Sequence, residues 1–381
     1  MFKKFHITVK NNKFLSFAVL CIVCFILAGW GAVGHKLINR KATYNFPPQM
    51  SAFNYWRDSL AYHASDADYR KSSDTAESRR HFIDIDEYGG FIATGRIPQT
   101  LDSLYALYGY NFVMSNGIVP FAIIAFTDSV KKAFQQGNWQ KAMLHSADLG
   151  HYVADAHQPL HITRNYDGQY TNQSGIHSRY ETQMINRDSS YIQFPRDSVL
   201  YVSNINNFVF TFLYSNYPYV DSVLKADSIA HALTGSTNSE AYYQMLWNLS
   251  GNFTIRLFRN ASKFLSSLIY TAWVNAGSPL PIYIAGQENT FPEYFTLYQN
   301  YPNPFNPGTM IHYDLKEAGF VELKIFDISG KEVYSLVNNF QKQGEYSYNI
   351  SAKELHLSSG IYLYRLSTNG FTDTKKMVVT K

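Results

Sequence analysis

From residue 30 to about residue 277, apolar residues recur at helical intervals and are separated by polar breaks. One run places Phe121, Ile124, Ala125, Val130 and Ala133 at successive intervals of three, one, five and three residues. Such spacing is typical of a helix with an apolar stripe that faces a core. The pattern predicts an all-α domain over residues 30–277.

The periodicity changes at Phe295, where apolar and polar residues begin to alternate. The alternating runs are MIHYDL, FVELKIF, EVYSLV, EYSYNI, GIYLYRL and KKMVV, separated by turn signals such as DISGK and SSG. Short strands at this density predict a small Ig-like β-sandwich over residues 295–381. Residues 278–294 are rich in Pro and Gly and are predicted to be a linker. The expected fold class is therefore an all-α domain followed by a small all-β sandwich.

The first 29 residues have the pattern of a secretory signal peptide. Lysines precede an apolar run from Phe14 to Leu27, and small residues follow it. The run is short for a membrane span, which needs ~20 residues. We therefore expect cleavage after Gly29 rather than membrane anchoring.

Composition changes this picture in two ways. Both cysteines, Cys21 and Cys24, lie in the predicted signal peptide, so we expect no disulfide in the mature chain. The same segment carries four lysines and no acidic residue, and the whole chain has a formal net charge of +4. The mature chain is then close to neutral, which excludes the overall basic charge typical of many nucleic-acid-binding domains.

The segment HYVADAHQPLH concentrates side chains that bind metals. His151 and Asp155 are four residues apart and would project from one face of a helix. Pro159 is expected to end that helix, and His161 to follow in a turn. The same interval recurs between His177 and Glu181 in GIHSRYETQMI. Two such pairs predict a metal site.

Other histidines and acids are weaker candidates. His157 and His145 are expected to be core residues, since His157 lies six residues from His151 and off its helical face. The segments HFIDID and HASDADYRK, taken alone, are typical of solvated turns and helix caps. They contain His81, Asp84, Asp86, His63, Asp66 and Asp68.

The available ligands favour zinc. Without thiolates, imidazole and carboxylate groups suit zinc best among common metals, with manganese or iron as lesser alternatives. Calcium would require more oxygen ligands. The segment WGAVGH places His35 five residues after Trp30. Signal cleavage would give Trp30 a free α-amino group of pKa roughly 8, from which a metal can displace the proton.

The motifs WGAVGH, HFID, GIVPF, HYVADAHQPLH and HSRYE together resemble those of one superfamily. It comprises the bacterial zinc-dependent phospholipases C and the single-strand-specific zinc nucleases of fungi and plants. The resemblance runs from Trp30 to about Gly277. It implies an all-α fold that holds three zinc ions in a cleft, with a mature N-terminal Trp as a ligand.

By position, the resemblance implies nine metal ligands: Trp30, His35, Asp68, His81, His151, Asp155, His161, His177 and Glu181. In the family, the aspartate matching Asp155 bridges two ions. The residues matching His35 and Trp30 hold one of these two ions. The third ion is held by the residues matching His161, His177 and Glu181. The resemblance leaves open whether Asp68 or Asp66 is the aspartate ligand at that position. It also implies catalytic roles for Asp155 and for Asp68, or in its place Asp66, which would orient or deprotonate the attacking water.

The expected function is a secreted, zinc-dependent phosphoesterase that cleaves phosphodiester bonds with metal-activated water. HSRYE and HYVAD favour a phospholipase C, whereas WGAVGH and HQPLH favour a single-strand-specific nuclease or 3′-nucleotidase. The substrate is then a phospholipid, or a single-stranded nucleic acid or nucleotide. A third alternative is a catalytically inactive exported metal-binding or adhesive protein. We expect a monomer.

The C-terminal region carries a second resemblance. YQNYPNPFNPGTMIHYDL, LKIFDISGKEV, LSSGIYLYRL and TKKMVVTK resemble the sorting domain of proteins exported by the type IX system of Bacteroidetes and related bacteria. The resemblance covers essentially all of residues 295–381. It implies interaction with the type IX machinery, passage across the outer membrane, and then release or attachment at the cell surface.

Overall fold

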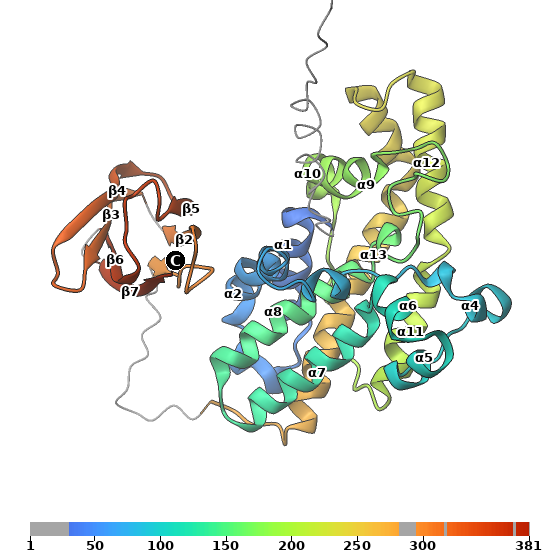
Figure 1. Ribbon diagram of the computed structural model, residues 1–381, viewed down its shortest axis with the longest axis horizontal. Coiled ribbons are helices and arrows are strands. Elements are labelled where there is room, and N and C mark those ends of the chain that lie inside the picture. The colour runs from blue at the N-terminus through green and yellow to red at the C-terminus, as the bar shows by residue number, and fades with distance from the viewer. Residues whose placement is uncertain (1–29, 282–294, 316–317, 369–370, 381) are drawn as a thin grey trace, which may run out of the picture. The chain divides into compact units, whose positions relative to one another are not determined.

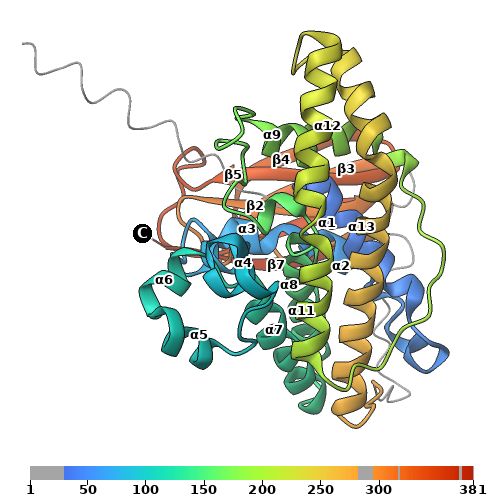
Figure 2. The same ribbon diagram turned by 90° about the vertical axis from the view of Figure 1, so that its right-hand side faces the viewer.

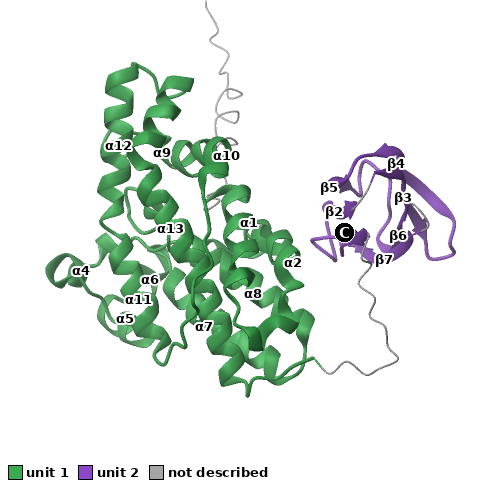
Figure 3. Cartoon of the chain, turned by 180° about the vertical axis from the view of Figure 1, so that it is seen from behind, with its two compact units in different colours: residues 1–281 green, residues 282–381 purple. Residues whose placement is uncertain are grey.

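The computed structural model describes residues 30–281, 295–315, 318–368 and 371–380. The chain divides into two compact units, residues 1–281 and 282–381 (Figure 3). The described part of the first is helical and that of the second is built of strands (Figure 1). The predicted fold class, an all-α domain followed by a small β-sandwich, is thus confirmed. The predicted signal peptide and residues 282–294 of the predicted linker lie outside the described residues.

The helical unit contains long helices connected by short helical turns. No helix in the described ranges has an apolar stretch long enough to cross a membrane. The α-helices are α1 (Gly31–Ala42), α2 (Trp56–Tyr62), α3 (Asp66–Arg70), α4 (Gly89–Thr94), α5 (Leu101–Tyr108), α6 (Tyr110–Ser115), α7 (Val119–Gln135), α8 (Trp139–Asp155), α9 (Ile176–Ser178), α10 (Ile185–Asp188), α11 (Ile205–Asn216), α12 (Tyr219–Thr234) and α13 (Glu240–Asn275). The 3-10 turns are Thr43–Asn45, Pro48–Phe53, His63–Ser65, Glu77–Arg80, Ile85–Glu87, Pro159–His161 and Ser189–Tyr191.

Helix α13 is the longest element and contacts α1, α7, α8 and α12. Figure 2 shows it running alongside α12. Its buried serines bond to carbonyls, as when Ser266 Oγ lies 2.7 Å from Ser262 O and 2.8 Å from Ala42 O at the end of α1. Such bonds satisfy a hydroxyl within the core. The small side chains also let neighbouring helices approach closely.

Helices α7 and α8 form an antiparallel pair. The buried stripe of α7 runs through Ile123, Thr127, Val130 and Phe134. Of the positions predicted to face the core, Phe121, Val130 and Ala133 are buried, whereas Ala125 is exposed because it lies on the opposite side of the helix. Its placement in the apolar stripe was therefore wrong.

Helix α8 carries His151 and Asp155 of the HYVADAHQPLH segment into the core. It begins after Asn138, whose Oδ1 accepts a hydrogen bond from Lys141 N at 3.0 Å, and ends at Asp155. The sequence predicted that Pro159 ends this helix, but the helix ends four residues earlier. All residues from 149 to 155 are buried. His151 and Asp155 thus lie on a helical segment enclosed on every side.

An amide bridge fixes α1 against α8 and α2. Asn39 Nδ2 donates to Leu60 O at 3.1 Å and to Ala147 O at 3.0 Å. Gly150 makes room for this side chain, because a Cβ there would lie 2.0 Å from Asn39 Oδ1 and 2.7 Å from Leu265 Cδ2. The close contact brings His35 of α1 next to His151 of α8.

The second unit is a sandwich of two antiparallel sheets. One sheet has the order β1-β2-β5 and the other β4-β3-β6-β7. Its core contains Ile311, Leu323, Ile325 and Leu366. The strands are β1 (Phe295–Leu297), β2 (Gly308–Leu315), β3 (Gly319–Asp327), β4 (Glu332–Gln341), β5 (Gly344–Ser351), β6 (Gly360–Thr368) and β7 (Phe371–Val379).

We predict that Gly150→Ala destabilises the helical unit by about 1–3 kcal/mol, because the new methyl group overpacks the contact between α1 and α8. Urea unfolding followed by the far-UV helical signal measures this. Gly89→Ala is the matched control, since a Cβ at Gly89 meets nothing within 4 Å. An equal loss of stability in both variants would contradict the assigned role of Gly150.

Candidate metal centre

Eight of the nine predicted ligands come together in three groups of metal-binding side chains. The groups are His35, His151 and Asp155; Asp68, His81 and His151; and His161, His177 and Glu181. Within each group the possible ligand atoms lie within 4.8 Å of one another. They come from α1, α3, α8, α9 and the segments that follow Glu77–Arg80, α8 and α9.

Asp155 connects the first two groups. Its Oδ1 lies 3.6 Å from His35 Nε2, while its Oδ2 lies 3.0 Å from His81 Nδ1 and 3.3 Å from His151 Nε2. The rings of His35 and His151 stack with centroids 3.9 Å apart. One carboxylate therefore offers a different oxygen to each of two adjacent groups.

The geometry separates the two aspartates that the sequence left as alternatives. Asp68 Oδ1 lies 3.5 Å from His151 Nε2 and 3.7 Å from His81 Nδ1. Asp66 is directed elsewhere, and its Oδ2 lies 2.6 Å from His63 Nδ1. Asp68 Oδ1 also accepts a hydrogen bond from Lys71 Nζ at 2.7 Å. Asp68 is thus the aspartate of the second group.

The third group depends on an irregular helix. His177 lies in the short helix α9, which continues as a π-helix over Arg179–Met184. His177 Nε2 lies 2.9 Å from Glu181 Oε2 and 3.1 Å from His161 Nε2. The four-residue interval predicted the pair of side chains, but not the π-helical backbone. Such π segments are frequent at functional sites.

Trp30 immediately precedes α1 and is buried against Tyr180 and Phe258. A Cβ on its neighbour Gly31 would lie 3.7 Å from Glu181 O. The start of α1 therefore lies beside the segment that carries Glu181. Coordination through the α-amino group of Trp30, which requires cleavage after Gly29, stays a prediction.

Three of the histidines are oriented by main-chain carbonyl groups. The Nδ1 atoms of His151, His161 and His177 lie 2.7, 2.8 and 3.0 Å from Ala64 O, His81 O and Tyr166 O. A proton on each Nδ1 satisfies its carbonyl and leaves Nε2 to face the group, which is the usual arrangement of metal-binding histidines.

The buried centre leaves polar atoms without partners. Both oxygens of Asp155 and both ring nitrogens of His35 are buried and form no hydrogen bond within the described residues. Burial raises the pKa of Asp155, but the charges of His151 and His161 outweigh it and lower the pKa well below its usual value. Burial, with the charge of His151, lowers the pKa of His35 to about 3. His35 is therefore neutral beside this carboxylate, and a divalent ion between them would give both groups the partner that they lack, so these residues fit a divalent metal ion.

The other histidine and acidic candidates lie outside the three groups. His157 is buried, with Nδ1 2.7 Å from Val153 O and its ring stacked on Phe212. His145 is half-buried beside Phe126. Asp86 accepts hydrogen bonds from the Thr163 hydroxyl at 2.7 Å and the Arg164 amide at 2.9 Å, and so has a structural contact instead.

Asp84, the remaining acid of HFIDID, is half-buried. Burial, with the charges of Asp86 and Glu87, raises its pKa to about 7. It does not belong to any of the three groups.

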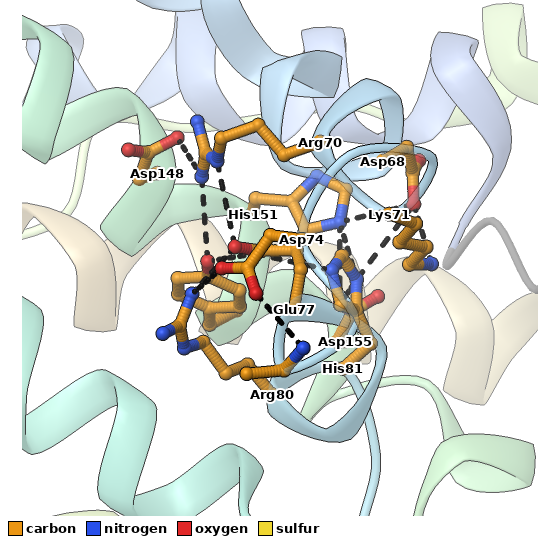
Figure 4. Close-up of polar contacts among 12 residues, drawn as sticks. Asp68, Arg70, Lys71, Asp74, Glu77, Arg80, His81, Asp148, His151 and Asp155 are labelled. Atoms are coloured by element: carbon orange, nitrogen blue, oxygen red, sulfur yellow. Dashed lines mark hydrogen bonds and ion pairs between the residues drawn. The ribbon is translucent and has the colours of Figure 1, made fainter.

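Sequence reasoning missed a cluster of charged residues behind His81. Glu77 is fully buried, and its carboxylate contacts His81, Arg70 and Arg80 (Figure 4). It also accepts a hydrogen bond from the Tyr152 hydroxyl. The segment AESRR, residues 76–80, is polar in sequence, which is typical of an exposed connector. The four-residue interval from Glu77 to His81, the same interval as in the two pairs noted above, was the signal that could have identified it.

Comparisons with known proteins identify the C-terminal unit. Residues 299–380 match the family described as the secretion system C-terminal sorting domain. The chain is therefore an exported protein, secreted or held at the cell surface, and its sorting domain implies interaction with the type IX machinery. The expected localisation is confirmed.

Most of the chain is similar to solved structures of clostridial toxins. Alpha toxin from Clostridium absonum is 12% identical, with a TM-score of 0.42, over 93% of this chain and 96% of that chain. Alpha-toxin from an avian strain of Clostridium perfringens is 11% identical, with a TM-score of 0.45, over 92% and 98% of the two chains. A sequence comparison with curated proteins finds no significant match.

We predict that His151→Ala loses most of the bound zinc, because His151 belongs to two of the groups. His157→Ala should keep its zinc and lose only stability, by roughly 2–4 kcal/mol from the cavity left in the core. Elemental analysis after dialysis measures the first effect and urea unfolding the second. Loss of zinc from His157→Ala would mean that the helix face of α8 has been misassigned.

Proposed function

We propose that this exported protein is a zinc-dependent phosphodiesterase of the phospholipase C type. The observation that carries the proposal is the sharing of Asp155, and of His151, between two adjacent groups of buried metal-binding side chains. Two ions held by these groups would suit in-line displacement at phosphorus, where both the attacking and the leaving oxygen carry negative charge. The third group, His161, His177 and Glu181, would hold a further ion.

The chain's own residues prepare the site for this chemistry. Zinc bound by these groups would activate water and offset the charge of a phosphodiester. Asp68, beside His81 and His151, is the carboxylate that would orient the attacking water or accept its proton. Lys71, whose ammonium contacts Asp68, adds a positive charge at this end of the site and favours an anionic substrate.

A nuclease or 3′-nucleotidase activity is the second candidate. Tyr166 is 41% exposed, and its ring lies 6.3 Å from the ring of His177 in the third group. Arg164 stacks on the exposed ring of Tyr170 at 5.3 Å. An aromatic ring next to a metal site can stack on a nucleobase, which typically contributes about 1–3 kcal/mol per base. We favour the phospholipase assignment because the last ligand of HSRYE is a glutamate, Glu181, and because the nearly neutral mature chain does not favour a polyanionic substrate.

We expect the purified mature protein to hydrolyse bis(p-nitrophenyl) phosphate, to lose this activity with chelator and to regain it with zinc. Asp155→Asn should reduce the rate at least about 100-fold, since it removes the charge that both groups share. Chelator-insensitive or absent turnover in zinc-loaded protein would favour an inactive metal-binding or adhesive protein instead.

A side-by-side assay separates the two substrate classes. Phosphatidylcholine vesicles, single-stranded DNA, single-stranded RNA and 3′-nucleotides are offered to the same zinc-loaded preparation. We expect release of phosphocholine at the highest kcat/KM. Preferential cleavage of the nucleic acids or nucleotides would replace the first candidate by the second.

We predict that one extra residue before Trp30 selectively lowers the zinc content. The extension converts the α-amino group into an amide, which does not readily lose its proton to a metal. Elemental analysis of the extended and mature forms measures this difference. Equal zinc content and equal activity would remove Trp30 from the ligand set.

A further inference from the structure

His81 presents a different nitrogen to the metal centre from the histidines that main-chain carbonyls orient. Its Nδ1 lies 3.0 Å from both Asp155 Oδ2 and His151 Nε2 and 3.7 Å from Asp68 Oδ1. His151, His161 and His177 instead direct Nδ1 at a carbonyl and Nε2 into their groups. Compared with the rings of those three histidines, the ring of His81 is turned so that Nδ1 faces the centre and Nε2 points away from it.

The group behind His81 is a carboxylate. Glu77 Oε1 lies 3.4 Å from His81 Nε2, and both side chains are 1% exposed. His81 Nε2 has no hydrogen-bond partner within the described residues. Glu77 is thus the acidic group that faces the outer nitrogen of this ring, at the four-residue interval that also relates His151 to Asp155.

Other residues hold Glu77 in place as an anion. Arg80 Nη1 donates to its Oε2 at 2.6 Å, and Arg70 Nε approaches the same oxygen at 3.4 Å. The Tyr152 hydroxyl donates to Oε1. Arg70 is itself fixed by Asp148 at 2.8 Å, as Figure 4 shows. A buried carboxylate with two guanidinium neighbours acts as an acceptor only, because it stays ionised.

We propose that Glu77 is a positioning residue for the metal centre, which fixes the proton of His81 on Nε2 and so makes Nδ1 the metal-binding nitrogen. This inference rests on the metal site of the proposed function. Glu77 does not touch the metal or the substrate. It acts through His81, by setting the tautomer and orientation of the ring.

The arginines make this arrangement compatible with burial. Glu77, Arg70, Arg80 and Asp148 carry charges of both signs, so the cluster adds little net charge behind the centre. A carboxylate without them would be costly to bury.

The test compares Glu77→Gln with Asp148→Asn in the full mature chain. Each variant exchanges a carboxylate of the same cluster for an amide of similar size, but only Glu77 faces His81. Equilibrium competition with a chromophoric chelator measures zinc affinity. We expect Glu77→Gln to weaken the affected zinc site about 10–100-fold and Asp148→Asn to leave it within about twofold of the wild type. Equal weakening in both variants, or none in folded Glu77→Gln, overturns the proposal.

A measurement on the wild type covers the case in which Glu77→Gln does not fold. Long-range ¹H–¹⁵N correlation spectra of histidine-labelled, zinc-loaded protein distinguish the protonated ring nitrogen from the metal-bound one. We expect His81 to carry its proton on Nε2, and His151, His161 and His177 on Nδ1. Zinc on Nε2 of His81 overturns the proposal. Neither readout depends on turnover, so a protein that binds zinc but cleaves no phosphodiester overturns the proposed function and leaves the role of Glu77 standing.

Discussion

The interaction on which the helical unit depends is the burial of the Asp155 carboxylate among histidines. Both of its oxygens are removed from water and form no hydrogen bond in the described part of the chain. Four histidines, at positions 35, 81, 151 and 161, approach it within 3.6 Å from α1, α8 and two connecting segments. Such an arrangement is unfavourable without a compensating positive charge. A metal ion would supply that charge, and the site and the fold would then be stabilised by the same contact.

The packing around the centre follows from this requirement. Asn39 and Gly150 bring α1 against α8, and the buried serines of α13 allow its neighbours to lie close. The carbonyls of Ala64, His81 and Tyr166 each orient one histidine. The described helical residues contain no cysteine, so bound metal would take the place that disulfides have in many exported proteins. The sorting domain has its own core and serves a separate purpose, which is export.

Local patterns predicted the elements, and long-range contacts determined the site. The apolar periodicities located the helical unit and the sandwich, and the four-residue intervals paired His151 with Asp155 and His177 with Glu181. Sequence spacing could not distinguish Asp66 from Asp68, because the choice depends on the direction of α3 relative to α8. It also did not reveal the π-helix after His177 or the burial of Glu77. A glutamate before two arginines is typical of an exposed turn, and the spacing does not reveal that Tyr152 and Arg70, which lie outside this segment, contact the carboxylate of Glu77.

The central claim is that the three groups of side chains hold metal ions. Anomalous diffraction recorded on both sides of the zinc absorption edge, from crystals of the mature protein, tests it directly. We predict an anomalous peak in each group, with the first two peaks on opposite oxygens of Asp155 and the third between His161, His177 and Glu181. The absence of peaks from these positions in zinc-loaded crystals would contradict the account.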